Sequence, residues 1–221
     1  MIIVSTSFIL GSRSPRRLEL LGQLVPAESI RVMPPRSTDE AGFGNLHMWP
    51  EIETRMMDVA RTKCEDVLEQ IHADEDGPSA KEEVVVIAAD TTIVATDATG
   101  RPVVLGQPPE DGAWTETVRR WFQEFYFGRT HVAATALCVA TPLGKKTERI
   151  VKSQVTFHDD GQRWLDWYLG TGEPRGKAGG YALQGAGSIF VSRVEGSISN
   201  VVGLPLEELL DVFEELEVHV D

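Results

Sequence analysis

The stretch SRSPRRLELL at residues 12–21 decides how this chain begins to fold. Ser14 is a favourable N-cap residue, and Pro15 suits the first helical position, where its missing N–H costs nothing. The apolar residues 8–10 predict a strand before this helix, and Gly11 predicts the turn between the two. The chain is therefore expected to open with a strand–turn–helix unit.

The predicted helix begins with two cations. Arg16 and Arg17 occupy its first turn, where free backbone N–H groups and the helix dipole favour an anion. The alternative is a solvated basic turn on a surface helix, but that reading leaves two cations at the positive end of a dipole unexplained. Leu18, Leu21 and Leu24 are expected to face the interior. The stretch therefore favours an anion site.

The composition is that of an acidic globular protein. The 221 residues carry a formal net charge of -13, which argues against duplex nucleic acid as a partner but allows a local nucleotide pocket. Cys64 and Cys138 are far apart, which excludes a zinc knuckle and a disulfide scaffold and fits a reducing compartment. No apolar run reaches membrane-spanning length and no signal peptide is recognisable, so we expect a cytoplasmic protein without a membrane partner.

The strongest predicted strand is VVVIAA at residues 84–89. A continuous β-branched and apolar run is typical of a central strand that is buried on both faces. We expect this strand to end in Asp90-Thr91-Thr92, where the carboxylate of Asp90 is a candidate for chemistry because ligands gather at the carboxyl ends of strands. The alternative is an aspartate that caps a turn, and the strand context alone does not decide between them.

The remaining patterns predict alternating helices and strands. Helices are expected at residues 50–71, 113–125, 164–169 and 206–216, and strands at 29–33, 102–105, 132–140, 148–157 and 188–191. The aromatic face of the helix at 113–125 is expected to be core rather than a stacking platform. His131 is expected to be a hydrogen-bonded structural residue rather than a ligand. Residues 41–50 and 73–83 are interpreted as inserted surface loops.

A glycine-rich stretch, EPRGKAGGYALQGAG, occupies residues 173–187. So many glycines predict backbone that turns sharply or lies close to a ligand, the alternative being a flexible surface loop. Lys177 is a candidate phosphate partner. Gln184 offers a paired donor and acceptor that can read the edge of a base.

Together these segments resemble the Maf family of nucleoside triphosphate pyrophosphatases. The matching motifs are SRSPRRLELL at 12–21, DE at 39–40, ARTK at 60–63, ADT at 89–91, GRTH at 128–131, TA at 135–136, KAGGYALQG at 177–185, GS at 196–197 and NVVGLP at 200–205. Several motifs in a fixed order are a more specific signal than any one alone. The family is similar in fold to the inosine triphosphatase-like enzymes. This implies a single α/β domain over residues 1–221, with an elongated mixed β-sheet flanked by helices and two lobes around a central substrate cleft.

The resemblance also implies an activity. Family members hydrolyse the α–β phosphoanhydride of a nucleoside triphosphate with a divalent cation, Mg²⁺ or Mn²⁺, and residues 177–185 look like the subgroup that acts on dTTP and UTP. Asp90 would be the proton acceptor that activates water, and Glu40 and Asp90 would be the metal carboxylates. Magnesium is usually held by one or two carboxylates together with substrate phosphates. The oligomeric state stays open, a homodimer being one option.

The substrate-binding residues are expected in the same motifs. Arg16, Thr91 and Gln184 match positions that family members use to select the base. Arg17 and Lys63 make sense as cationic clamps, because phosphoryl chemistry depends mostly on positioning and charge neutralisation. The full set of predicted substrate-binding residues is Ser12, Arg16, Arg17, Lys63, Thr91, Lys177 and Gln184.

One position departs from the family pattern. Gln107 stands before Pro108, where the family usually has a lysine. A charge-assisted phosphate contact of this kind is worth on the order of 1.5–3 kcal/mol. Its loss would mean slower turnover, a shifted substrate, or compensation by Arg101 or another nearby base. Two alternatives therefore stay open: a catalytically weakened nucleotide-binding regulator of cell division, and a pyrophosphatase of the same fold with another base preference.

Overall fold

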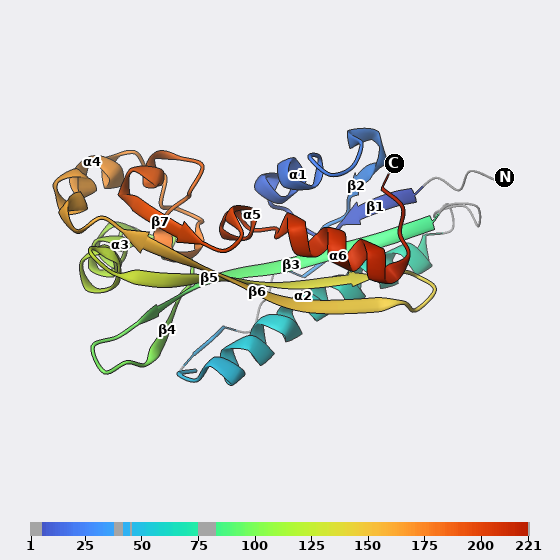
Figure 1. The fold of residues 1–221 in the computed structure, drawn as a ribbon, viewed down its shortest axis with the longest axis horizontal. Helices are drawn as coiled ribbons and strands as arrows, with labels where there is room; N and C mark the ends of the chain where they lie inside the picture. The colour runs from blue at the N-terminus through green and yellow to red at the C-terminus, as the bar shows by residue number, and fades with distance from the viewer. Residues whose placement is uncertain (1–5, 38–41, 45, 75–82, 221) are drawn as a thin grey trace.

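An elongated mixed β-sheet runs along the molecule and carries helices on both faces (Figure 1). The computed structural model describes residues 6–37, 42–44, 46–74 and 83–220. The strands are β1 (Thr6–Leu10), β2 (Ile30–Val32), β3 (Glu83–Thr96), β4 (Pro102–Leu105), β5 (Thr130–Ala140), β6 (Lys146–Phe157) and β7 (Val191–Glu195). The α-helices are α1 (Pro15–Leu21), α2 (Trp49–Ala73), α3 (Trp114–Trp121), α4 (Leu165–Gly170), α5 (Ile198–Val202) and α6 (Leu206–Leu216). Shorter helical segments are η1 (Ala27–Ser29), η2 (Phe122–Tyr126), η3 (Asp159–Trp164), η4 (Ala178–Gly180) and η5 (Ala186–Phe190).

The described strands form one seven-stranded sheet in the order β2-β1-β3-β5-β6-β7, with β4 paired to β3. Strand β1 is parallel to both β2 and β3, whereas the other pairs are antiparallel. The long strands β3, β5 and β6 form the spine of this sheet. The mixed α/β architecture predicted from the sequence is confirmed.

Strand β3 is buried on both faces, as its β-branched run predicted. Successive side chains of a strand point to opposite faces. Val85 and Ile87 pack in the cluster beneath α1 and α6, and Val84 and Val86 pack in the cluster against α2. Each of these side chains is at most 6% exposed. Alternate side chains of β3 therefore face two different helical layers, one with α1 and α6 and the other with α2.

A third cluster fills the other end of the sheet with aromatic side chains beneath α3 and α4. Phe122 and Tyr126 are fully buried, and Phe122 makes edge-on contacts with the rings of Phe157 and Phe190. The prediction that this aromatic face is core is confirmed. His131 is also structural, since its Nε2 lies 2.8 Å from the hydroxyl of buried Tyr181.

The prediction that the central strand ends in Asp90-Thr91-Thr92 was wrong. Strand β3 continues to Thr96, because Ile93 and Val94 extend its apolar pattern and pair with β4 on one side and β5 on the other. Asp90 therefore lies in the middle of a long strand. Its backbone is held in register opposite Ala136 of β5.

Two smaller expectations also need correction. Residues 186–190 form η5 rather than a strand, and β7 begins at Val191, because Ser188 folds back to bond the carbonyl of Gly185. Leu18 is 38% exposed, because α1 presents Leu20 and Leu21 to the sheet instead. The N-cap of α1 is as predicted: the Ser14 hydroxyl accepts a hydrogen bond from the backbone N–H of Arg17.

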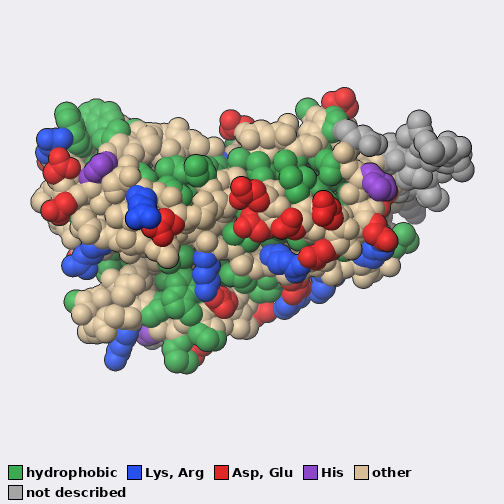
Figure 2. Space-filling view, in the orientation of Figure 1, with side chains coloured by type: hydrophobic (Ala, Val, Ile, Leu, Met, Phe, Trp, Pro, Cys, Tyr) green, Lys and Arg blue, Asp and Glu red, His purple; other side chains and the backbone are tan. Residues whose placement is uncertain are grey.

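Helices α2 and α6 lie where the apolar periodicity predicted them. Figure 2 shows acidic side chains gathered over the face that carries α6, whose sequence contains five acidic residues. This face repels polyanions such as a nucleic-acid duplex. Within the described ranges, no helix is long and apolar enough to cross a membrane. The predicted Asp39–Glu40 motif lies outside the described residues.

Candidate functional site

The cleft arises from a notch in the sheet beside the middle of β3. Strand β1 pairs with β3 only as far as Ile87, and β4 begins to pair at Ile93. Between these two points the described part of the sheet has a strand next to β3 on one side only, the side of β5. Residues 88–92 of β3 therefore form a rigid floor whose other edge is open to ligands.

The notch opens into a cavity of about 730 Å³. It is lined by the start of α1, residue 63 of α2, the middle of β3, the 106–107 turn, the 176–184 segment and the 201–203 turn. The predicted site residues that line it are Ser12, Arg16, Arg17, Lys63, Asp90, Thr91, Lys177 and Gln184. The fold thus brings these predicted site residues, which are spread over the sequence from Ser12 to Gln184, together in one cleft. The predicted metal ligand Glu40 lies outside the described residues.

Lys63 and Asp90 form the most buried ion pair of the cleft. Lys63 Nζ donates to Asp90 Oδ1 at 2.8 Å, and the two side chains are 15% and 12% exposed. Residue 90 shares the face of β3 that packs on α2, so helix and strand present the two charges to each other. Asp90 Oδ2 has no hydrogen-bond partner among the residues that the structure describes. This oxygen is therefore available to a water molecule or a cation.

Arg17 is bound into the wall of the cleft. Its Nε donates to the carbonyl of Gly203 at 2.8 Å, and its terminal nitrogens donate to Ser12 Oγ at 3.2 Å and Thr91 Oγ1 at 3.0 Å. Thr91 in turn lies 2.9 Å from Thr135 Oγ1. These contacts tie α1, β3, β5 and the 203 turn together. The phosphate role of Arg17 and the base-selecting role of Thr91 remain predictions.

Arg16 and Lys177 bring like charges near each other from two segments far apart in the sequence. Partial burial and the charge of Arg16 lower the pKa of Lys177. The ammonium group donates at 2.5 Å to the carbonyl of Glu173. An anion bound between the two cations would relieve their repulsion. The electrostatics thus favour a polyanionic ligand at this end of the cleft.

The glycine-rich segment is ordered by tight packing rather than flexible. Gly179 has φ of +69°, its N–H donates to the carbonyl of Gly106 at 2.9 Å, and its carbonyl accepts from the buried Tyr126 hydroxyl at 2.9 Å. A Cβ at Gly179 would lie 2.5 Å from that hydroxyl and 2.7 Å from a side-chain carbon of Ile93. The predicted sharp turn of the backbone is confirmed, whereas its approach to a ligand stays a prediction, and the turn leaves Lys177 beside the cleft.

Gln107 also lines the cleft, so the position that departs from the family pattern belongs to the site. Arg101 was one of the cations expected to compensate for it. The backbone of Arg101 is held by Asp97 in the turn before β4, and Arg101 is not among the described residues that line the cavity.

A bidentate ion pair outside the cleft fixes α2, and sequence reasoning missed it. Arg61 Nε and one terminal nitrogen each donate at 2.9 Å to the carboxylate of Glu148 on β6, 87 residues away. Hydrogen bonds from Arg61 and Lys146 outweigh partial burial and lower the pKa of Glu148 to about 2. The pair sets the register of α2 on the sheet, two residues from Lys63. The ARTK motif contained the arginine, but nothing in it indicated its distant partner.

Glu148→Gln is expected to lower the free energy of unfolding by roughly 1–3 kcal/mol at pH 7, after allowance for solvent screening. Because folding lowers the pKa of Glu148 from 4.5 to about 2, its contribution is complete above pH 4.5 and is lost as the pH falls through about 2. Urea unfolding of wild type and variant between pH 7 and pH 2.5 measures the difference. The control is Glu195→Gln, which removes the exposed partner of Arg193 and should change little. If the difference in unfolding free energy between wild type and Glu148→Gln stayed constant with pH, it would contradict the lowered pKa of Glu148.

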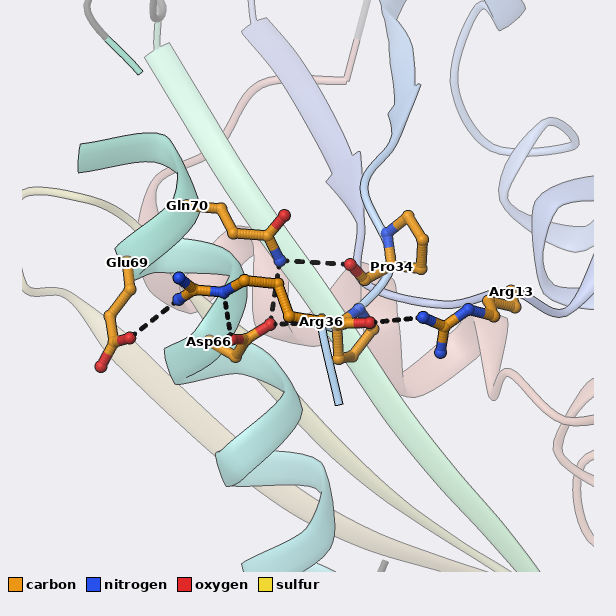
Figure 3. Close-up of polar contacts among 7 residues, drawn as sticks. Arg13, Pro34, Arg36, Asp66, Glu69 and Gln70 are labelled. Carbon is orange, nitrogen blue, oxygen red and sulfur yellow. Dashed lines mark hydrogen bonds and ion pairs between the residues drawn. The ribbon is translucent and has the colours of Figure 1, made fainter. Parts of the chain in front are cut away.

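The segment before the undescribed residues 38–41 is braced against α2 (Figure 3). Arg36 donates from its backbone N–H and its Nε to Asp66 at 2.7 and 2.8 Å, and from a terminal nitrogen to Glu69 at 2.9 Å. Gln70 Nε2 bridges Asp66 and the carbonyl of Pro34. Burial raises the pKa of Asp66, but the hydrogen bonds from Arg36 and Gln70 outweigh it and hold the pKa below its usual value.

Arg13 attaches the same segment to α1. Its terminal nitrogen donates to the carbonyl of Pro35 at 2.7 Å (Figure 3). Pro35 and Ser37 line the cleft from this side. The third arginine of the opening stretch therefore shapes the entrance of the cleft, a role that its sequence context did not indicate.

The carboxylates available for a metal are few in the described part of the cleft. Asp90 is the acidic residue among the described lining residues, and no group of three His, Cys, Asp or Glu side chains there could hold a metal ion alone. One carboxylate with a free oxygen fits Mg²⁺, which commonly arrives with its own waters and substrate phosphates. It does not fit a structural zinc site, which needs four protein ligands.

Comparisons with known proteins show the family to which the chain belongs. The model of a family described as Maf-like protein matches residues 7–216. A dTTP/UTP pyrophosphatase of Anaeromyxobacter dehalogenans (strain 2CP-C) is 40% identical over 205 residues, which cover 90% of this chain and 89% of that protein. A dTTP/UTP pyrophosphatase of Chelativorans sp. (strain BNC1) is 36% identical over 207 residues, covering 94% and 90%.

Among solved structures, a nucleoside-triphosphatase / dITP/XTP pyrophosphatase from Mycobacterium abscessus matches 94% of this chain and 93% of its own, with a TM-score of 0.42 and 15% identity. The mixed sheet and its cation-lined notch define the class, an α/β protein whose cleft favours a small anion. Within that class, the chain belongs to the Maf family.

Proposed function

We propose that this protein hydrolyses dTTP and UTP to the nucleoside monophosphate and pyrophosphate. It is an enzyme, a hydrolase of phosphoanhydride bonds, as are its relatives by name. The observation that carries the proposal is the buried Lys63–Asp90 pair on the floor of a cleft whose other charged lining residues, among those described, are cations. A carboxylate held there can take a proton from water while the cations balance the charge of a triphosphate.

The chemistry assigned to Asp90 is general-base catalysis. Asp90 Oδ2 accepts a proton from a water molecule, the water oxygen forms a bond to the α-phosphorus, and the bond to the bridging oxygen breaks. Pyrophosphate leaves with the electron pair of that bond. Lys63 holds Oδ1 at 2.8 Å and so fixes the direction in which Oδ2 points. Such catalysis typically contributes about 10²–10⁴-fold to the rate.

The other residues of the cleft divide into three groups by the role we assign to them. Arg16 and Lys177, whose charges are near each other, suit the phosphates. Gln184 suits the base, since its amide can donate and accept at once. Arg17 bonds Ser12, Thr91 and the carbonyl of Gly203, so we propose that these contacts also keep the wall of the cleft in shape.

A divalent cation, Mg²⁺ or Mn²⁺, fits this scheme as a partner of the substrate. Asp90 would hold it together with the phosphates, with Glu40 as a second carboxylate by family resemblance. When bound, the cation would neutralise charge on the phosphates and on the departing pyrophosphate. We propose that the whole chain acts as one unit around this cleft.

Gln107 favours the second candidate function, a nucleotide-binding regulator with weakened catalysis, because its amide replaces a cation in the cleft. The purified protein should be given Mg²⁺ or Mn²⁺ and a panel of canonical and modified nucleoside triphosphates, with pyrophosphate release as the readout. We expect the largest kcat/KM for dTTP and UTP. Tight binding in calorimetry without turnover would support the regulator instead, and a preference for another base would move the protein to a different substrate class.

A further inference from the structure

Glu173 lies between two parts of the glycine-rich segment and bonds to both. Its Oε2 accepts a hydrogen bond from the backbone N–H of Ala186 at 2.6 Å, and its Oε1 accepts from the N–H of Gly187 at 3.0 Å. The hydroxyl of Tyr168 donates to Oε1 at 3.1 Å. One carboxylate thus holds the backbone two and three residues after Gln184. Hydrogen bonds to an ionised acceptor are among the stronger ones in proteins.

The carboxylate also fills the space beside the backbone that follows Gln184. A Cβ added at Gly185 would lie 2.3 Å from Glu173 Oε2 and 2.7 Å from its carboxyl carbon. Gly185 has φ of -115°, so backbone strain does not demand glycine there. The lack of a side chain at residue 185 is therefore explained by the carboxylate that packs against it. The backbone directly after Gln184 therefore packs against the Glu173 carboxylate with no space for a side chain.

The Tyr168 side chain anchors this arrangement in the aromatic core. Its ring is fully buried and stacks edge-on against Phe190, the last residue of η5. Its hydroxyl also lies 3.2 Å from the carbonyl of Gly180. The hydrogen bond from Tyr168 thus anchors the Glu173 carboxylate to the buried aromatic core.

Lys177 is held by a different atom of the same residue. Its ammonium donates to the backbone carbonyl of Glu173 at 2.5 Å, a contact that changes of the side chain leave in place. Substitution at residue 173 can therefore disturb the Gln184 side of the segment and spare the Lys177 side. This separation makes the role of the carboxylate testable.

We propose that Glu173 is a positioning residue that sets the place of Gln184 and thereby the discrimination between bases. The inference rests on the proposed function, in which Gln184 reads the base. In Glu173→Gln, one acceptor oxygen becomes an NH₂ group, which faces the backbone N–H of Ala186 in one orientation of the amide and that of Gly187 in the other. That conflict should displace the backbone at residues 186 and 187. Gln184 then loses its fixed place relative to the floor of the cleft.

The experiment compares kcat and KM for dTTP and dGTP in wild type, Glu173→Gln and Gln184→Ala. We expect the preference for dTTP, as a ratio of kcat/KM, to fall by about tenfold in Glu173→Gln, mainly through a higher KM for dTTP. Glu124→Gln, which changes an exposed carboxylate of η2, should leave the ratio unchanged. Hydrogen exchange of the amides at residues 184–190 in the protein without nucleotide should be faster in Glu173→Gln alone.

Two further variants keep the test decisive. Gly185→Ala should reproduce the loss of selectivity and should not add to Glu173→Gln, because both displace the same contact. If Glu173→Gln does not fold, Tyr168→Phe removes one of the three contacts and should shift the ratio in the same direction. An unchanged ratio in a folded Glu173→Gln variant, with Gln184→Ala altered, would overturn the inference. A wild type inactive on every nucleotide would instead overturn the proposed function, while the exchange measurement would still test the contact.

Discussion

Asp90→Asn is expected to lower kcat for nucleotide hydrolysis by about 10²–10⁴-fold while KM changes by less than about threefold. The asparagine side chain has nearly the same shape, and its carbonyl oxygen can still accept the hydrogen bond from Lys63 Nζ. Its NH₂ group cannot take a proton from water. The loss should therefore appear in the chemical step rather than in binding. Steady-state kinetics with dTTP measure it, and calorimetry measures the affinity of the variant.

The matched control for Asp90→Asn is Asp166→Asn. Asp166 is an exposed carboxylate of α4 whose partner is Arg119, and it is outside the described lining of the cleft. Its replacement should leave kcat within about twofold of wild type. Equal activity of Asp90→Asn and wild type would remove Asp90 from the chemistry. Circular dichroism of the variants shows whether a loss of activity comes from unfolding.

Gly179→Ala is expected to destabilise the fold by about 3 kcal/mol, since two costs combine. An alanine at φ of +69° is strained by about 1 kcal/mol. Its Cβ would also lie 2.5 Å from the Tyr126 hydroxyl in a closely packed aromatic core, and such overpacking typically costs about 1–3 kcal/mol. For a chain of this length, the melting temperature should fall by about 6–12 °C.

Gly172→Ala separates the two costs. Gly172 has φ of +70°, almost that of Gly179, but no atom lies within 4 Å of a Cβ placed there. Its replacement should therefore cost about 1 kcal/mol, the backbone strain alone. Thermal unfolding of both variants measures the difference. Equal melting temperatures for the two would mean that the contact with Tyr126 is not tight.

The sequence predicted the parts of the fold that depend on local patterns. The cap of α1 at Ser14, the length of α6 and the two-sided burial of β3 each follow from the residues of one segment. The family motifs predicted which distant segments share the cleft. They did so because several of the motifs carry a residue that lines it, such as Arg16, Asp90 or Lys177.

What the sequence did not predict depends on contacts between segments. The continuation of β3 past Asp90 is decided by pairing with β4 and β5. Arg61 finds Glu148 only because β6 lies beneath α2. The carboxylate of Glu173 reaches backbone that is 13 residues further along the chain. No local sequence pattern predicts these partners, because they come into contact only when the chain is folded.

The products formed from dTTP test the central claim most directly. Wild type and Asp90→Asn should be incubated with dTTP and Mg²⁺, and the nucleotide and phosphate products separated and quantified. We predict equal amounts of thymidine monophosphate and pyrophosphate from wild type and almost none from Asp90→Asn. Release of thymidine diphosphate with inorganic phosphate, or equal rates for the two proteins, would contradict hydrolysis at the α-phosphorus with Asp90 as the base.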